Sequence, residues 1–288
     1  MPRHALVSML AMGLVMRLVS LPAVSLADDI RPKAPETAFS GKLRPDILGI
    51  STESNAESAR AIFDSLFKGR TDTKTDIQQQ KFGGASYVAA LNFSLPAGSK
   101  QNGEMLSTSF SSPASANRAY FVARNLTFAQ DQQPSKADMI KEVMGKYGVP
   151  TIVGDQHLYY IYRKGSIMSV GGKYKEATAL EAIDKPLDPR AAVKLNGDTV
   201  RGSCVAVVKR AQTKVRESSA MLAEAKGANC DGVLSVQLVP GTPADRVGIA
   251  QFTLLDVRQL VSAAAIDGAA LAVGQNEGSM PKGSAPKL

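Results

Sequence analysis

Few side chains in this sequence are of types that do acid–base, nucleophilic or metal chemistry. The chain has two histidines and two cysteines in 288 residues. His157 lies in the apolar and aromatic run QHLYYIY, where a lone histidine is typical of packing rather than of catalysis. No G-x-S-x-G motif occurs, and no histidines or cysteines have the close spacing of a zinc site. The sequence therefore predicts no catalytic residue, no metal site and no cofactor.

Two short patterns resemble chemical motifs without completing them. Ser65 and Lys68 match S-x-x-K, but they fall in the last turn of an expected helix and the companion K-T-G is missing. Asp72 and Asp76 lie in the polar stretch 70–84, which lacks the remaining positions of a calcium loop. Carboxylates that pair across strands leave no sequence pattern. A secreted carboxylate-based hydrolase therefore stays as an alternative.

The first 27 residues have the layout of a cleaved secretory signal peptide. Arg3 precedes an apolar stretch over 5–16, and Ser25 and Ala27 place small residues just before the cleavage point. Arg17 ends the apolar stretch well short of the roughly 20 residues that a membrane-spanning helix needs. We predict export to the periplasm or beyond the cell, with cleavage near Ala27 and no transmembrane segment in the mature chain. Cleavage removes two arginines and no acid from a chain of formal net charge +8.

Export would place the two cysteines in an oxidising environment, where disulfides form. Cys204 and Cys230 each stand at the start of an apolar run, and neither belongs to a C-x-x-C motif. Two cysteines in an exported chain are expected to pair. A Cys204–Cys230 disulfide would stabilise the fold by about 3 kcal/mol.

Basic side chains form the first candidate binding surface. They occur in two stretches that are poor in acids, as Arg163, Lys164, Lys173, Lys175, Arg201, Lys209 and Arg210. On one face, they would attract lipopolysaccharide, anionic phospholipid or another anionic polymer. A charge spread evenly over a solvated surface is the alternative. Nucleic acid is not an expected partner of an exported chain.

Tyrosines form the second candidate surface. Tyr159, Tyr160 and Tyr162 lie in one expected strand. Alternation places Tyr160 and Tyr162 on one face and Tyr159 on the other. We expect one of these faces to be core and the other to contact a sugar or a protein partner.

Helices and strands are indicated by hydrophobic periodicity and by cap residues. We expect a helix capped by Ser54 with Glu57, a helix that Ser135 with Asp138 begins and Gly148 ends, and a final helix capped by Asp256 with Gln259. Another helix is expected within 213–226, and 70–84 is expected to be a loop. The expected strands are 86–95, 104–112, 117–128, a hairpin over 157–172, 203–208, 232–239 and 249–255.

Short connections between the strands favour antiparallel pairing and an α+β fold. We expect antiparallel sheet or sheets with amphipathic helices packed on one face, built from two helix-plus-strands units. Residues 28–47 are expected to be a linker or arm and residues 268–288 a disordered tail. Between them, 48–267 form the exported domain, either whole or divided into about 48–130 and 131–267.

Two motifs carry a resemblance. Residues 46–50 read D-I-L-G-I, and residues 146–151 read K-Y-G-V-P-T ahead of the aromatic strand 157–162. This order is similar to a broad group of uncharacterised exported proteins of Gram-negative bacteria, in which the first motif is a strand. The helix-then-hairpin arrangement also resembles the small lipoprotein of the outer-membrane β-barrel assembly machinery and the β-lactamase inhibitory proteins. The resemblance implies helices on one face of an antiparallel sheet and no catalytic residue.

These features together predict a non-enzymatic exported protein of the cell envelope. We expect it to bind a protein or an anionic envelope component. Besides the carboxylate-based hydrolase, a secreted effector or inhibitor that acts by protein–protein contact is an alternative.

Overall fold

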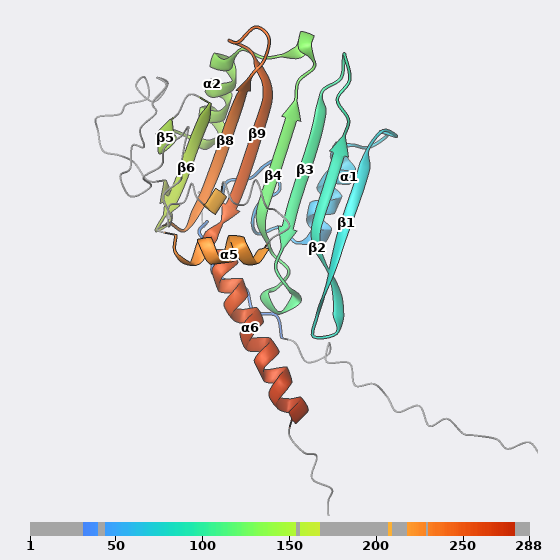
Figure 1. The fold of residues 1–288 in the computed structure, drawn as a ribbon, viewed down its shortest axis with the longest axis vertical. Helices are drawn as coiled ribbons and strands as arrows, with labels where there is room; N and C mark the ends of the chain where they lie inside the picture. Colours follow the sequence, from blue (N-terminus) through green and yellow to red (C-terminus); the bar gives the residue numbers. More distant parts are fainter. Residues whose placement is uncertain are drawn as a thin grey trace, which may run out of the picture.

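A computed structural model describes residues 31–39, 44–153, 156–167, 207–208, 218–228 and 230–279 (Figure 1). Within these residues, nine strands form one sheet in the order β1-β2-β3-β4-β9-β8-β6-β5, with β7 paired to β6. Every neighbouring pair is antiparallel. The predicted α+β class with an antiparallel sheet is therefore confirmed.

Nine strands are described in the structure. They are β1 (Lys74–Phe82), β2 (Ala85–Leu95), β3 (Gly103–Phe110), β4 (Ala119–Thr127), β5 (Ile152–Val153), β6 (His157–Arg163), β7 (Ser166–Ile167), β8 (Gly232–Pro240) and β9 (Val247–Asp256). The helices are α1 (Ala56–Leu66), α2 (Lys136–Tyr147), α5 (Ser218–Lys226) and α6 (Val257–Ser279), with 3-10 turns at Pro113–Ser115 and Gln130–Gln132. Because β4 pairs with β9, both halves of the chain belong to one continuous sheet.

The edge strand β1 corrects a prediction. Residues 70–84 were expected to be a loop, but Lys74–Phe82 pairs with β2 along its whole length. The sequence TDIQQQK has no apolar alternation because almost all of β1 is exposed to solvent on both faces. A strand that buries neither face lacks the periodicity by which strands are recognised.

Helix caps agree with the sequence in two cases out of three. Ser135 caps α2, and its Oγ accepts a hydrogen bond from the Asp138 N–H at 3.1 Å. The cap of α1 lies one residue later than predicted, at Asn55, whose side chain accepts from the Ser58 N–H at 2.8 Å. The final helix begins as predicted, with Asp256 Oδ1 accepting from the Gln259 N–H at 2.8 Å.

Helix α6 runs further than expected. The tail was predicted to be disordered from residue 268, but α6 continues to Ser279 and projects away from the sheet (Figure 1). The prediction is wrong for 268–279 because alanine and leucine in this stretch favour helix strongly enough to offset its glycines. Residues 280–288 lie outside the described part of the chain.

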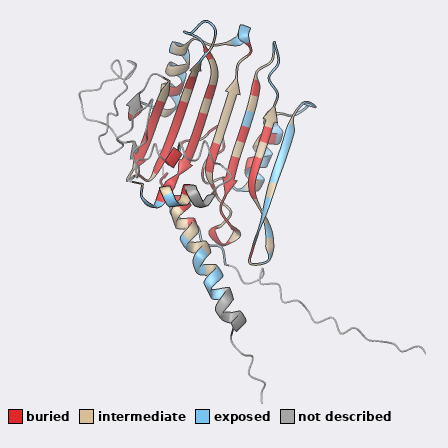
Figure 2. Ribbon diagram, viewed as in Figure 1, coloured by how far each residue is buried: buried red, intermediate tan, exposed pale blue. Residues whose placement is uncertain are grey.

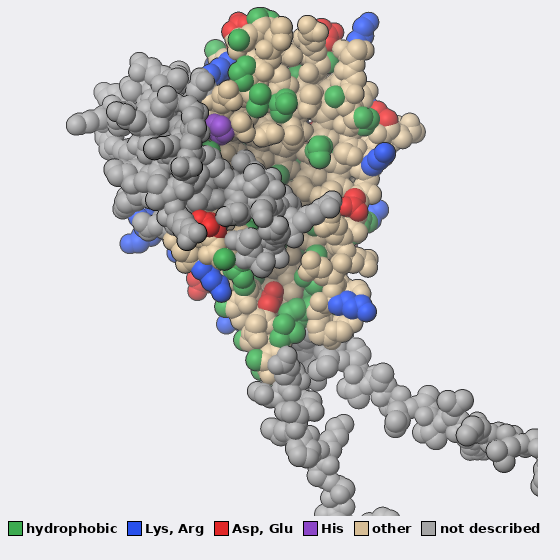
Figure 3. All heavy atoms as spheres, in the orientation of Figure 1, with side chains coloured by type: hydrophobic (Ala, Val, Ile, Leu, Met, Phe, Trp, Pro, Cys, Tyr) green, Lys and Arg blue, Asp and Glu red, His purple; other side chains and the backbone are tan. Residues whose placement is uncertain are grey.

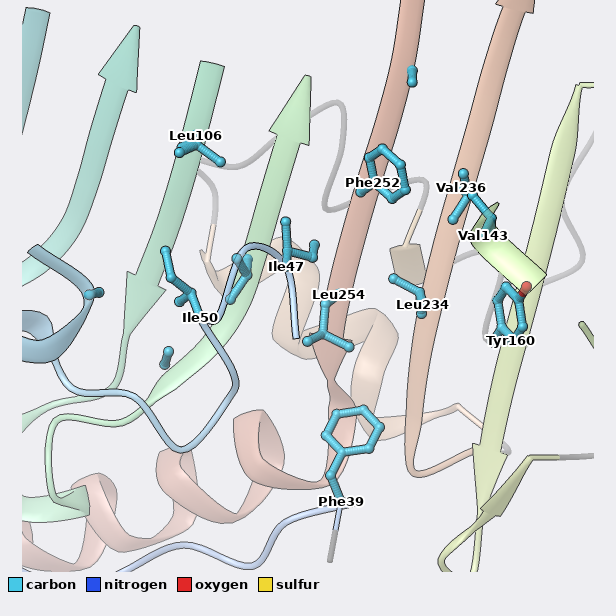
Figure 4. Close-up of a cluster of buried hydrophobic side chains, with 14 of the residues drawn as sticks. Phe39, Ile47, Ile50, Leu106, Val143, Tyr160, Leu234, Val236, Phe252 and Leu254 are labelled. Carbon is cyan, nitrogen blue, oxygen red and sulfur yellow. The ribbon is translucent and has the colours of Figure 1, made fainter. Parts of the chain in front are cut away.

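One face of the sheet carries α1 and α2, and we call it the covered face. Its side chains form the larger apolar core, in which Leu91, Leu106, Phe252 and Leu254 are almost completely buried (Figures 2 and 4). Figure 4 shows that core residues from the strands converge with Val143 of α2. Burying each of these large side chains contributes about 1.5–3 kcal/mol, so this layer holds the sheet and the helices together.

The residues before α1 belong to the same core. Phe39 is only 2% exposed, and its ring meets the edge of Tyr162 with centroids 4.9 Å apart. Ile47 is equally buried. The stretch predicted to be a linker is therefore, in its described part, a strap packed on the sheet.

The two motifs behind the resemblance meet in space. Residues 46–50 form a tight turn rather than the expected strand, because Leu48 and Gly49 have positive φ angles of 54° and 85°. Lys146 Nζ lies 2.9 Å from Asp46 Oδ1, and the Tyr147 hydroxyl donates to the Asp46 carbonyl at 2.8 Å. The first motif therefore fixes the end of α2 against the strap.

We call the opposite face of the sheet the open face. Only its lower end in Figure 1 is covered by described helices, namely α5 and the start of α6. There, Met221 and Leu260 pack with Val233 and Leu255 in a second, smaller core. Val207 and Val208 also belong to this core, and they are helical rather than part of the strand predicted over 203–208.

Candidate functional site

Polar side chains run across the open face in two parallel rows. The strand register places directly opposite residues side by side, from one strand to the next. The first, which we call the amide row, contains Lys74, Ser94, Met105, Asn125, Gln251, Gln237 and His157. The second, which we call the hydroxyl row, contains Asp76, Asn92, Ser107, Ala123, Thr253, Ser235 and Tyr159. Its last three members are at most 2% exposed, so the accessible part of this row runs from β1 to β4.

Polarity falls along the strands towards α5. On β9, Gln251 and Thr253 of the two rows are followed on the same face by Leu255 of the smaller core. On β8, Gln237 and Ser235 are followed in the same way by Val233. The open face is therefore apolar where α5 and α6 cover it and polar beyond them.

Hydrogen bonds hold one end of the hydroxyl row in place. The Ser107 hydroxyl donates to Asn92 Oδ1, and the Asn92 amide donates to Asp76 Oδ2 at 3.3 Å. The Gln78 amide donates to the same carboxylate oxygen at 3.3 Å. This chain links β1, β2 and β3 and orients the side chains before any ligand arrives.

Each row also contains one buried side-chain oxygen without a hydrogen-bond partner among the described residues, Ser235 Oγ in the hydroxyl row and Asn125 Oδ1 in the amide row. The opposite neighbours of Asn125 are Met105, whose side chain is 59% exposed, and Gln251, which is partly exposed. A polar acceptor without a partner is unusual in a folded protein, because the lost hydrogen bond costs about 1–3 kcal/mol.

A hollow of about 680 Å³ lies over these rows. It reaches from Asp76 on β1 to Gln251 on β9, and its floor includes the small residues Ala90, Ser107 and Ala123. Figure 3 shows this face, and over the centre of its described upper part neutral side chains dominate while charged ones lie around the rim. The site is therefore a shallow, largely uncharged depression.

A second hollow of about 670 Å³ continues from the first towards α6, and the two share Asp76, Gln78 and Ser109. Tyr120 lines it, and burial raises the pKa of Tyr120 to about 12. The hydroxyl of Tyr120 therefore stays protonated at physiological pH, as a hydrogen-bonding group without charge.

Two carboxylates line this second hollow, at opposite ends. Asp267 accepts hydrogen bonds from Ser112 and Ser115, both at 2.7 Å. Asp267 lies near Tyr87 of β2, which is opposite Gln80 of β1. The other carboxylate, Asp76, is about 13 Å from Gln80 along β1. Glycosidase carboxylates work at separations of about 5–10 Å. This arrangement does not favour the carboxylate-based hydrolase.

Two of the seven candidate basic residues belong to the described part of the chain. Arg163 and Lys164 lie at the predicted hairpin turn between β6 and β7, whereas Lys173, Lys175, Arg201, Lys209 and Arg210 lie outside the described residues. Asp231 sits beside this turn, where it accepts from the Lys164 N–H and from Arg258 at 2.9 Å. Whether the basic residues share a face stays a prediction.

The prediction that the tyrosines of β6 form a contact surface is wrong. Tyr160 and Tyr162 do face the larger core and Tyr159 the smaller one, as alternation predicted. All three side chains, however, are at most 2% exposed. The sheet is covered on both faces at β6, so these tyrosines are packing residues and offer no contact surface.

The remaining candidates concern histidine and cysteine. His157 stacks on Tyr159 with ring centroids 5.5 Å apart, at the end of the amide row. Cys230 is buried, but Cys204 lies outside the described residues, so their disulfide stays a prediction. Among the described residues, no cluster of histidine, cysteine and acidic side chains could hold a metal ion.

No helix in the described part of the chain is long and apolar enough to cross a membrane. Comparisons with protein-family models, curated proteins and solved structures find no match.

The two rows were not predicted, although the sequence contains a signal for them. In β2 and β9, polar residues alternate with apolar ones, as in Asn92 and Ser94 against Leu91 and Phe93. Such alternation shows that one face of a strand is polar. That the polar faces of strands far apart in sequence line up follows only from the β4–β9 pairing.

Proposed function

We propose that this protein is a non-enzymatic, exported protein of the cell envelope that binds its ligand on the open face. The single observation that carries the proposal is the pair of polar rows, aligned in register across the sheet and hollowed by a depression of about 680 Å³. A face that served only stability would be covered or scattered with charge. This one is concave and ordered by side-chain hydrogen bonds, and beyond α5 and the start of α6 no described helix covers it.

The case against catalysis in the depression comes from its lining. Asp76 is its one carboxylate among the described residues, and it accepts hydrogen bonds from Asn92 and Gln78. General acid–base chemistry on a glycosidic bond uses two carboxylates. Binding without turnover is the simpler role for this set of side chains.

The ligand expected from sequence was a protein or an anionic envelope component. Lys74 is the one basic residue on the open side of the depression among those described, since Arg124 pairs with Glu104 in the layer of the covered face. The open face alone therefore supplies little attraction for an anion. An anionic component would depend on the basic residues outside the described part of the chain.

We further propose that the domain consists of two equivalent helix-plus-strands units. The first would be α1 with β1, β2, β3 and β4, and the second α2 with β5, β6, β8 and β9. Support comes from the strand order, which runs outward from the central β4–β9 pair in the same sequence on each side. The ligand surface would then span the junction of the units, since Asn125 and Gln251 are opposite each other across it.

The proposal is tested by co-sedimentation of the purified mature protein with isolated Gram-negative cell envelopes. We expect the double variant Asn125→Ala/Gln251→Ala to lose most of the binding. The matched control Gln79→Ala/Gln130→Ala removes two exposed amides that belong to neither row, and we expect it to bind like the wild type. Equal binding by both variants would exclude the open face as the binding surface.

The same assay at low and high salt separates the expected ligand classes. Loss of binding at high salt, equal in both variants, would indicate an anionic component held by basic residues elsewhere. Binding that resists salt and depends on the amide row supports the open face.

A further inference from the structure

We infer that the ligand of the open face is an uncharged glycan segment. The inference rests on the proposed binding function and specifies its ligand class. It follows from the hydrogen-bonding character of the two rows, from the shortage of charge on the face and from the kinds of contact residue the face lacks.

Hydrogen-bonding character is the first argument. An amide side chain offers both donors and an acceptor, and a hydroxyl offers one donor and two lone pairs. Sugar hydroxyls have the same double character, so the partly exposed amides and hydroxyls of the two rows are complementary to them. These are Asn92, Ser94, Ser107, Asn125, Gln237 and Gln251. The amide row repeats from strand to strand at about 4.8 Å, which lets successive groups on an extended glycan meet successive side chains.

Charge is the second argument. The centre of the depression has neutral side chains, with Lys74 and Asp76 together at its β1 end. Among the described residues, an anionic ligand laid across Asn92, Ser107 and Asn125 would meet no guanidinium or ammonium group to balance it. A neutral ligand loses no ionic hydration on entering such a site, so the uncharged class is favoured.

The third argument is that the two rows lack the residue types that dominate protein–protein interfaces. Protein interfaces draw most of their binding energy from Trp, Tyr and Arg in the centre of the contact. The chain has no tryptophan, and neither row presents an exposed tyrosine or arginine. Met105 provides an exposed apolar side chain between Ser94 and Asn125, suited to the C–H face of a sugar ring.

Asn125 supplies an independent observation. Its buried Oδ1 has no partner among the described residues, although it stands between Met105 and Gln251 in the middle of the row. Asn125 as a whole is partly exposed, and its amide would have to reorient on binding for a sugar hydroxyl to donate to this acceptor. The unpaired oxygen is therefore a group whose hydrogen bond a ligand completes.

The experiment is a glycan array that contains both uncharged and acidic oligosaccharides, followed by calorimetry with the best uncharged hexasaccharide. We expect binding of uncharged members at high salt. Asn125→Ala and Gln251→Ala are each expected to weaken binding about tenfold, since each removes hydrogen bonds to the ligand. Gln79→Ala, on the other side of β1, is expected to leave the affinity unchanged.

Other outcomes overturn the inference in recognisable ways. Binding of acidic members alone, lost at high salt, identifies an anionic ligand. No binding to any member, while envelope binding still depends on the amide row, identifies a protein ligand and leaves the proposed function standing. If envelope binding is also independent of the row, both the inference and the proposed function fail. Circular dichroism of each variant establishes that it is folded.

Discussion

The two faces of the same strands carry different kinds of side chain. On β9, Ala250, Phe252 and Leu254 enter the larger core, whereas Gln251 and Thr253 between them face the open side. The covered face packs against α1, α2 and the strap through large side chains, while the open face beyond α5 presents amides and hydroxyls. The difference teaches that the larger core lies on one side of the sheet, whereas the accessible polar positions lie on the other.

The largest expected effect is on the covered face. Leu254 is completely buried in the middle of the core (Figure 4). Leu254→Ala removes apolar contacts and leaves a cavity, so we expect the free energy of unfolding to fall by about 3 kcal/mol. Urea denaturation measures this loss. A loss below about 1 kcal/mol would show that the covered face does not carry the stability.

A second effect concerns the lower end of the sheet, where the strap and α6 meet. Asp256 accepts hydrogen bonds from the Ala38 N–H and the Gln259 N–H, and burial raises its pKa to about 6. The folded state therefore holds this proton more tightly than the unfolded state, whose carboxyl titrates near 4. The contribution of Asp256 protonation to stability is fully present below about pH 4 and is lost as the pH rises through about 6.

Asp256→Asn removes this titration. We expect the stability of the wild type relative to the variant to fall by up to about 3 kcal/mol between pH 4 and pH 7. Chemical denaturation at several pH values measures the difference, with Asp131→Asn on the exposed turn as a control. A difference that does not vary with pH would contradict the assignment.

A smaller effect is expected for the ion pair in the layer of the covered face. Arg124 Nε lies 2.6 Å from Glu104 Oε1, and the two side chains are 22% and 12% exposed. Glu104→Gln leaves a partly buried guanidinium without its counter-charge, so we expect a loss of about 1–2 kcal/mol. Asp64→Asn, in a solvent-exposed pair with Arg60, is expected to cost about 0–0.5 kcal/mol. Equal losses would remove the distinction between the buried layer and the surface.

The smallest effect on stability is expected on the open face. Gln251→Ala shortens a partly exposed side chain that no described helix covers, so we expect a loss of less than about 0.5 kcal/mol. Thermal unfolding beside Leu254→Ala measures the contrast within one strand. If Gln251→Ala destabilised the protein as much as Leu254→Ala, the open face would be structural and not a surface kept for a ligand.

Local signals explain which parts of the fold the sequence could predict. Ser135 and Asp256 are cap residues whose partners lie three positions ahead, and strands with one buried face show their alternation directly. The exposed strand β1 has no such alternation and was missed. The helical stretch 268–279 was missed because its glycines and polar ends look like a tail, although its alanines sustain the helix.

The candidate site was harder to predict because it depends on pairing between distant residues. Asn125 and Gln251 are opposite each other only because β4 meets β9 in this register. The tyrosines of β6 drew attention as aromatic side chains, yet helices and strap bury them on both faces. A polar side chain in a strand therefore becomes informative only when its neighbours across the sheet are known.

Photo-crosslinking tests the central claim most directly. The purified protein, with p-benzoylphenylalanine in place of Gln251 in one preparation and of Gln79 in another, is irradiated on isolated cell envelopes. Benzophenone inserts into C–H bonds, so it reports a glycan and a protein alike. The open-face account predicts an adduct from position 251 and none from position 79. Equal adducts from both positions, or an adduct from position 79 alone, would contradict it.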